Sequence, residues 1–147
     1  MFKHILVPTD GSDLSQKTLS YAAGVAKTLG ARITALYAKP PRQLTQAGEG
    51  FLNDLLAPDK LEERAERLAQ KCLEDAELAC QPLGVPCKTI AVTSDSPHQA
   101  IIDTAQREGC DLILMASHGR TGLSSLFVGS ETNKVLTHSA LPVLVYR

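Results

Sequence analysis

The sequence has no tryptophan, and aromatic residues account for only 4% of its 147 positions. Proteins that bind single-stranded nucleic acid stack bases on aromatic side chains, so this class of function is not expected. The 15 Lys and Arg residues nearly balance the 16 Asp and Glu residues, which leaves a formal charge of −1. Without excess positive charge, the chain has no general electrostatic attraction to nucleic acid or to an anionic membrane. We therefore expect neither as a partner.

Long apolar runs are also missing. A transmembrane helix needs roughly 20 predominantly apolar residues in succession, and no segment of the sequence approaches that length. The short run at 4–7, which is followed by Pro8, is too brief for the apolar region of a secretory signal peptide. These absences predict a soluble, cytoplasmic protein.

The four cysteines do not have the spacing of a metal site. They form no CxxC pair and have no accompanying cluster of histidines, so a structural zinc ion is not expected. We interpret them as small apolar residues that stay reduced in the cytosol. They are Cys72, Cys80, Cys87 and Cys110.

The rest of the sequence alternates between two patterns. Short β-branched runs, several of them apolar at consecutive positions, are typical of strands covered on both faces. Between them, apolar residues recur at steps of three and four, which predicts amphipathic helices. The predicted strands cover 4–7, 32–38, 87–93, 111–117 and 142–146, and the predicted helices cover 15–29, 59–83, 96–109 (with Ser96 at the N-cap) and about 130–138.

This alternation predicts an α/β fold. We expect one domain over 1–147, with a single doubly wound, five-stranded parallel sheet and helices on both faces. The segment 40–58, with its prolines and glycines, is predicted to be an irregular excursion that contains a short helical turn at 51–56.

Polar residues gather where two of the predicted strands end. The first strand is followed by Thr9, Asp10 and Gly11, and the fourth by the segment 116–119. In open parallel sheets, ligands bind beyond the carboxyl ends of the strands. If the first and fourth strands are neighbours, these two loops face each other across one crevice.

The segment 115–131 has the features of an anion site. Gly119 and Gly122 allow backbone conformations that bring amides close to a ligand. Gly129 and Ser130 lead directly into a predicted helix, whose first N–H groups have no partners within the helix and favour phosphate. Arg120 could add positive charge. The alternative is a turn followed by an ordinary N-cap, and the residues alone do not decide between the two.

Other functional motifs are missing. The sequence contains no Walker A motif, no GxGxxG and no GxSxG. Asp10, Ser12 and Asp13 form only half of a calcium loop, so no protein-built metal site is expected. The neighbours Ser117 and His118 are interpreted as a pair that stabilises a turn, since no carboxylate is evident to orient the imidazole. The remaining histidines, His4, His98 and His138, are expected at the surface or at helix ends.

Four segments give the chain a resemblance to the universal stress protein family: HILVPTDGSDLS, ITALYA, LILMASHGRTGLSSLFVGSETNKVL and PVLVYR. Nucleotide-binding members of that family carry Gly, two residues, Gly, nine residues, and then Gly with Ser or Thr. Gly119, the nine residues 120–128 and Gly129-Ser130 match this spacing, and Ala116 stands where the first glycine belongs. Alanine discourages positive φ and adds one methyl group, which would weaken nucleotide binding. Because alanine is the smallest departure from glycine, we expect binding to persist.

The resemblance implies a flavodoxin- or Rossmann-like sheet of strand order 3-2-1-4-5 and a site for ATP or AMP, with or without Mg²⁺ brought by the nucleotide. It assigns the nucleoside to the end of the first strand, the adenine to the ends of the second and fourth strands, and the phosphates to the glycine-rich segment. Only the backbone of Glu131 is assigned, because its carboxylate would repel a polyanion. The implied site residues are Pro8, Thr9, Asp10, Ala38, Met115, Ala116, Gly119, Gly129, Ser130 and Glu131.

The resemblance also implies a homodimer through the last strand, 142–146, which would cover an exposed sheet edge. The alternative is a monomer whose edge is protected by Pro142 and Arg147. We expect a stress-response protein that hydrolyses ATP slowly at most, because 120–128 contains no lysine and no base is evident to orient water. Two alternatives are a nucleotide-free module that binds proteins, and a hydrolase or transferase that uses His118 or Asp10.

Overall fold

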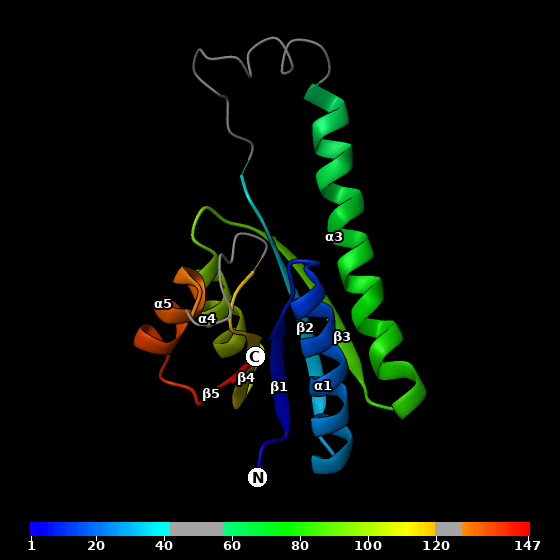
Figure 1. Ribbon diagram of the computed structural model, residues 1–147, viewed down its shortest axis with the longest axis vertical. Helices are drawn as coiled ribbons and strands as arrows, with labels where there is room; N and C mark the ends of the chain where they lie inside the picture. The colour runs from blue at the N-terminus through cyan, green and yellow to red at the C-terminus, as the bar shows by residue number, and fades with distance from the viewer. Residues whose placement is uncertain (42–57, 120–127) are drawn as a thin grey trace.

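The computed structural model describes residues 1–41, 58–119 and 128–147. Their strands form one five-stranded sheet in the order β3-β2-β1-β4-β5, and every neighbouring pair is parallel (Figure 1). The strands are β1 (His4–Pro8), β2 (Arg32–Lys39), β3 (Cys87–Thr93), β4 (Leu112–Ala116) and β5 (Val143–Tyr146). This topology confirms the predicted fold class and strand order.

The helices cover both faces of the sheet. One face packs against α1 (Asp13–Leu29) and α3 (Pro58–Cys80), which continues into the short 3-10 helix η1 (Gln81–Leu83). The other face packs against α4 (Pro97–Arg107) and α5 (Ser130–His138). Within the described ranges, no helix is both long and apolar enough to cross a membrane. The predicted excursion at 40–58, including the turn at 51–56, lies almost entirely outside the described residues.

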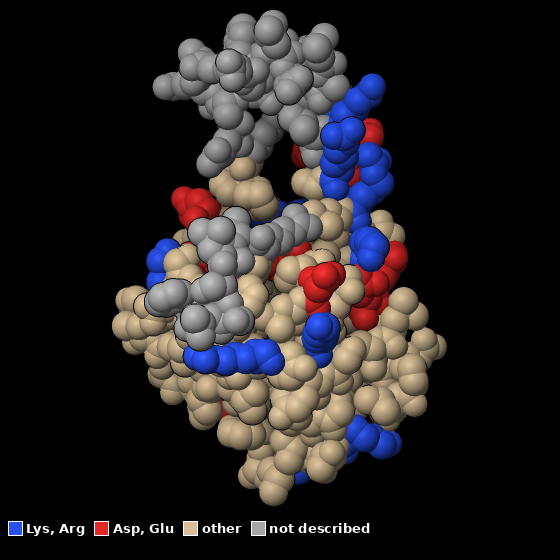
Figure 2. All heavy atoms as spheres, in the orientation of Figure 1, with Lys and Arg blue, Asp and Glu red and all other residues tan. Residues whose placement is uncertain are grey.

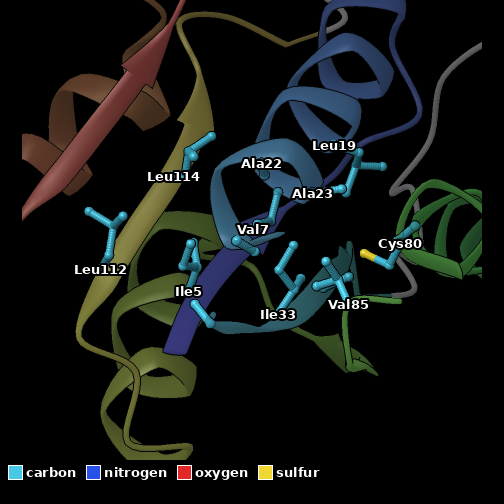
Figure 3. Packing of buried hydrophobic residues seen from close by; sticks show 14 residues of the cluster. Ile5, Val7, Leu19, Ala22, Ala23, Ile33, Cys80, Val85, Leu112 and Leu114 are labelled. Carbon is cyan, nitrogen blue, oxygen red and sulfur yellow. The ribbon is translucent and has the colours of Figure 1, made fainter. Parts of the chain in front are cut away.

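The consecutive apolar residues of β1 are explained by this layering. Ile5, Leu6 and Val7 are each 0% exposed. Because strand side chains alternate between faces, Ile5 and Val7 join the cluster under α1 and α3 (Figure 3). Leu6 joins the cluster under α4 and α5. The two clusters hold the helices on opposite sides of one central strand.

The helix α3 is amphipathic, as its apolar spacing predicts. Ala69, Cys72 and Ala76 are buried against the sheet and α1. Its outer face carries basic residues beside acidic ones (Figure 2), including an ion pair between Lys71 Nζ and Asp75 Oδ2 at 3.0 Å. This face is therefore an ordinary solvated surface.

The prediction that His4 lies at the surface or at a helix end is wrong. His4 is the first residue of the central strand and is only 5% exposed. Its Nε2 atom lies 2.8 Å from Oγ1 of Thr34 on the neighbouring strand. Burial, together with the positive charge of Arg32, lowers the pKa of His4, although Asp111 acts in the opposite direction. His138, in contrast, is exposed at the end of α5 as expected.

Asp111 fixes the beginning of β1 against the beginning of β4. Its carboxylate accepts hydrogen bonds from the amides of Lys3 (2.8 Å) and His4 (2.9 Å), and its own amide donates to the His4 carbonyl (2.9 Å). Burial opposes ionisation of this carboxyl group, but the two amide hydrogen bonds outweigh burial and lower the pKa of Asp111.

Replacing Asp111 with Asn is expected to lower the free energy of unfolding at pH 7 by about 1 kcal/mol, because the anionic acceptor is lost from a partly exposed site. Since the folded-state pKa is lowered, the stabilisation is present above the unfolded-state value of about 3.9 and disappears as pH falls through the folded-state value. Urea unfolding at pH 7 and in acid measures the difference. The same change at the exposed Asp95 is the control and should have little effect; a constant difference at every pH would contradict the explanation.

Candidate functional site

The loops that follow β1 and β4 meet at the carboxyl edge of the sheet. The two strands are paired through Ile5 with Leu112 and Leu6 with Ile113, so their loops start side by side. A Cβ atom added at Gly119 would collide with Oδ2 of Asp10. The backbone of the second loop therefore lies directly against the carboxylate of the first, which confirms that the two loops face each other.

The loop after β1 is held by hydrogen bonds to the start of α1. The Oγ1 atom of Thr9 lies 2.6 Å from Oγ of Ser15, and the amide of Asp10 donates to the same Ser15 oxygen (3.2 Å). One oxygen of Asp10 accepts the amide of Ser12 (2.9 Å). Gly11 has a φ of 78°, which a side chain would strain. The Thr9 hydroxyl thus anchors α1, while Asp10 places its second oxygen against Gly119.

The end of β4 is tied to the beginning of α5. The amide of Gly129 donates to the Ser117 carbonyl (2.6 Å), and the hydroxyl of Thr132 donates to the Ala116 carbonyl (3.0 Å). Ser117 Oγ lies 3.1 Å from His118 Nδ1, which is the local polar pair that the sequence predicts. These contacts place the first turn of α5 beside residues 116–119, although the segment 120–127 lies outside the described residues.

Gly129 is needed for close packing and not for an unusual backbone conformation. Its φ of −60° and ψ of 154° are accessible to any residue. A Cβ atom there would lie 3.1 Å from His118 Cα and 3.3 Å from the Ser117 carbonyl oxygen. Gly119 also has no positive φ and is constrained by its contact with Asp10. The sequence analysis expected backbone freedom at Gly119 and Gly122, and at Gly119 the constraint is the contact with Asp10 instead. Gly122 lies outside the described residues, and no such reason was given for Gly129.

Among the described residues, no side chain caps the N-terminus of α5, whose N-cap residue is Gly129. Ser130 and Glu131 therefore begin the helix with amides that have no partner inside it. The helix dipole adds partial positive charge at this end. Amides in this arrangement suit an anion such as phosphate.

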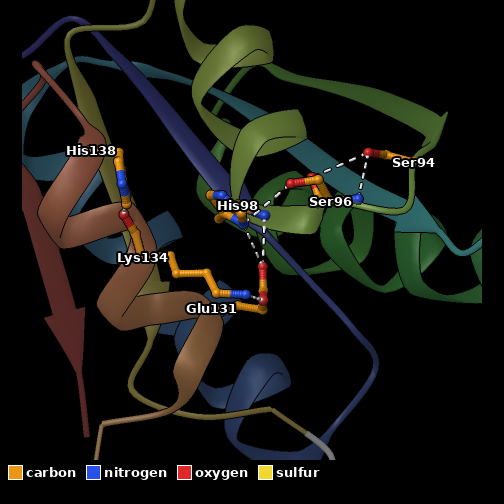
Figure 4. A network of polar contacts seen from close by, with 6 residues as sticks. All are labelled: Ser94, Ser96, His98, Glu131, Lys134 and His138. Atoms are coloured by element: carbon orange, nitrogen blue, oxygen red, sulfur yellow. Dashed lines mark hydrogen bonds and ion pairs between the residues drawn. The ribbon is translucent and has the colours of Figure 1, made fainter.

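The carboxylate of Glu131 is turned toward α4. Its Oε2 atom accepts the amide of His98 (2.9 Å) and lies 3.1 Å from His98 Nδ1, and its Oε1 atom lies 2.7 Å from Lys134 Nζ (Figure 4). Burial opposes ionisation, but the contacts with Lys134 and His98 prevail and lower the pKa of Glu131. No sequence signal links residues 98 and 131, and this partnership was not predicted.

Glu131 takes over the capping of α4 that was predicted for Ser96. Ser96 is the N-cap residue of α4, but its side chain makes no capping hydrogen bond within the described part of the chain. Its hydroxyl lies 3.3 Å from His98 Nδ1 instead. The helix start was therefore placed correctly, and the capping group comes from another helix.

The remaining predicted site residues lie at or near the same edge. Pro8 and Ala38 are partly exposed near the carboxyl ends of β1 and β2, and Ala116 ends β4. Met115 is only 6% exposed and packs in the cluster under α4 and α5. Their assigned contacts with a nucleotide stay predictions. A separate cavity of about 340 Å³ lies at the opposite, amino edge of the sheet, lined by residues that include His4, Arg32 and Lys88, and does not belong to this site.

A model of the universal stress protein family matches residues 1–147. The chain belongs to this family. It is 33% identical over 147 residues to a universal stress protein of Thermus aquaticus, and the match covers 100% of both chains. It is 30% identical over 151 residues to universal stress protein YxiE of Bacillus subtilis, again covering 100% of both. The predicted family is thereby confirmed.

Solved structures of relatives share the fold of this universal stress protein. The structure of protein MJ0577, from Methanocaldococcus jannaschii, has a TM-score of 0.79 and 28% identity, and the match covers 99% of this chain and 95% of that one. Two structures that share the fold at lower identity contain nucleotides. They are an Archaeoglobus fulgidus universal stress protein with dAMP (TM-score 0.69, 18% identity, 99% and 98% covered) and an Arabidopsis thaliana family member with AMP (0.64, 17%, 97% and 90%).

Replacing Gly129 with Ala is expected to lower the free energy of unfolding by roughly 1–3 kcal/mol, because the new Cβ would press on backbone atoms of residues 117 and 118. At Gly24, inside α1, an added Cβ would have nothing within 4 Å. Gly24→Ala should therefore raise the unfolding free energy by about 0.5–1 kcal/mol. Urea unfolding of the two variants measures both effects, and changes of the same sign would show that packing is not the constraint at Gly129.

Proposed function

We propose that this universal stress protein binds an adenine nucleotide, ATP or AMP, at the carboxyl edge of its sheet and acts in the stress response. The observation that carries the proposal is a difference among three helix starts at this edge. The first turn of α1 is capped by Ser12 Oγ and that of α4 by Glu131, whereas no side chain of the described ranges caps α5. The open amides of α5 lie beside residues 116–118, next to Gly119 and its contact with Asp10.

In this proposal the phosphates lie against Gly119, Gly129 and the amides of Ser130 and Glu131. The close packing at both glycines is compatible with the assignment, since it brings the backbone of Gly119 against Asp10 and the start of α5 against residues 117 and 118. The nucleoside would lie along Pro8, Thr9 and Asp10, with the adenine near Ala38 and Met115. Thr9 would contribute its backbone, because its hydroxyl is bound to Ser15.

Ala116 is compatible with this arrangement. It ends β4 in regular parallel pairing with Tyr146, so its backbone does not require the freedom of glycine. Its carbonyl accepts the Thr132 hydroxyl, which holds α5 in place. The methyl group is the one added obstacle at this position, and we propose that it weakens binding without preventing it.

We infer that the protein is a binding protein and not an efficient enzyme. The segment 120–128 contains no lysine that could stabilise the phosphates during hydrolysis. Any Mg²⁺ would be brought by the nucleotide and would face Asp10. We also propose that the protein is cytoplasmic, because its free cysteines would stay reduced in that compartment. The second candidate, a nucleotide-free module that binds proteins, is favoured only by Ala116.

Titration with a fluorescent ATP analogue should show saturable binding. The combined change of Gly129→Val with Ser130→Ala should abolish it, because the valine side chain would displace the start of α5 from residues 117 and 118 and the Ser130 hydroxyl would be lost; circular dichroism checks that the variant is folded. The matched control makes the same two changes in the middle of α1, as Gly24→Val with Ser20→Ala. Ser20 is exposed and an added Cβ at Gly24 meets nothing within 4 Å, so this control should bind as the unmodified protein does. Chromatography of the incubated samples should recover ATP largely intact. Absence of saturable binding at millimolar nucleotide would favour the protein-binding module.

We also propose a homodimer formed by antiparallel pairing of two copies of β5. The carbonyls of Pro142 and Tyr146 accept the amides of Ile113 in β4 and of Ser117 directly after it, so the alternate residues Val143 and Val145 direct their peptide groups to the opposite edge. Tyr146 is fixed by ring packing on Tyr21, with centroids 4.9 Å apart. Pairing with a second copy would satisfy the edge-facing groups.

Replacing Val145 with Pro removes one edge-facing N–H and is expected to shift the protein from dimer to monomer in sedimentation-equilibrium experiments. Val145→Thr keeps the N–H and nearly the same shape, so it should stay dimeric. Circular dichroism of both variants checks that the sheet is intact. A dimer that is unaffected by Val145→Pro would place the interface elsewhere.

A further inference from the structure

Glu131 occupies the second position of α5, where a carboxylate has two alternatives. It can fold back on the open amides of its own helix, which attract any nearby anion. It can also bind elsewhere and leave those amides free. The first alternative would place a negative charge where the proposed function requires phosphate.

The structure adopts the second alternative. Both carboxylate oxygens are occupied: Oε2 by the amide and ring of His98 on α4, and Oε1 by Lys134 on α5, the helix of Glu131 itself (Figure 4). The amide of His98 belongs to the first turn of α4, so the Glu131 carboxylate also caps the N-terminus of that helix. Of these three contacts, the His98 ring is the side chain that reaches Glu131 from a different helix.

The His98 ring is itself held in position. Ser96 Oγ lies 3.3 Å from its Nδ1 atom, and Ser96 in turn is held by Ser94, whose Oγ accepts the Ser96 amide at 3.0 Å. On its other side, the ring of His138 lies 5.9 Å away between centroids. The imidazole is only partly exposed, with 20% of the side-chain surface accessible. A ring packed in this way can fix the direction of the carboxylate.

We propose that His98 is a positioning residue that makes the site selective for phosphorylated nucleosides, by holding the Glu131 carboxylate away from the open amides of α5. This inference rests on the proposed nucleotide site. Without the ring, the carboxylate keeps its contacts with the His98 amide and with Lys134 but is less firmly directed. It then turns part of the time toward its own helix start and competes with phosphate for the same amides. The effect grows with the negative charge of the ligand, so it is largest for ATP and absent for adenosine.

The test is a double-mutant cycle in the full-length protein, with ATP, AMP and adenosine titrated separately. His98→Ala should weaken ATP binding roughly two- to fivefold, which is the typical range of a charge interaction with a helix terminus. AMP binding should weaken less, and adenosine binding should not change. His98→Asn, which restores a side-chain hydrogen-bond donor, should recover part of the loss.

The second half of the cycle adds His98→Ala to Glu131→Gln. Because the carboxylate charge is gone, the additional change should leave ATP affinity at the Glu131→Gln value. Equal loss for ATP and adenosine, persistence of the loss in the Glu131→Gln background, or no loss at all overturns the inference while the proposed function stands. If the unmodified protein binds none of the three ligands, the proposed function and this inference fail together. Urea unfolding of each variant shows that the comparisons are made on folded protein.

Discussion

The hydrogen bond from the Gly129 amide to the Ser117 carbonyl, at 2.6 Å, determines where α5 begins. It joins residues that flank the segment 118–128, and it requires the two backbones to approach more closely than a Cβ atom allows. The bond from Thr132 to the Ala116 carbonyl reinforces the same junction one turn later. The nucleotide site proposed for the carboxyl edge depends on this junction, because it places the open amides of α5 beside residues 116–118, and Gly119 that follows lies against Asp10.

Much of this architecture could be predicted from the sequence for a simple physical reason. The central strands are buried on both faces, so Ile5, Leu6 and Val7 leave a run of consecutive apolar residues that no surface strand would have. Gly30, which ends α1 in a left-handed conformation with φ of 62°, gives a similarly local signal. Such features depend on residues close together in the chain, and their positions were predicted nearly correctly.

The errors concern contacts between residues distant in the chain. The partner of His4 is Thr34, on a strand that becomes its neighbour only when the sheet forms. The partner of His98 is Glu131, 33 positions away on another helix. Neither pairing produces a recurring pattern in the sequence from which it could be predicted. Gly129 shows a subtler case, because the glycine is visible in the sequence but the atoms that require it, in residues 117 and 118, are not.

Glu131 also distinguishes the start of α5, the proposed anion site, from the other helix starts at this edge. Parallel strands direct the starts of α1, α4 and α5 to the same edge of the sheet, and each would attract an anion if its amides were left open. Ser12 occupies the first turn of α1, and Glu131 brings a full negative charge to that of α4. Glu131, which caps α4, belongs to α5. Because its carboxylate points toward α4, its negative charge is held away from the start of its own helix. A single side chain thus caps one helix and leaves the start of another without its charge, and the proposed selectivity of the edge for one phosphate position would follow from the direction in which that carboxylate points.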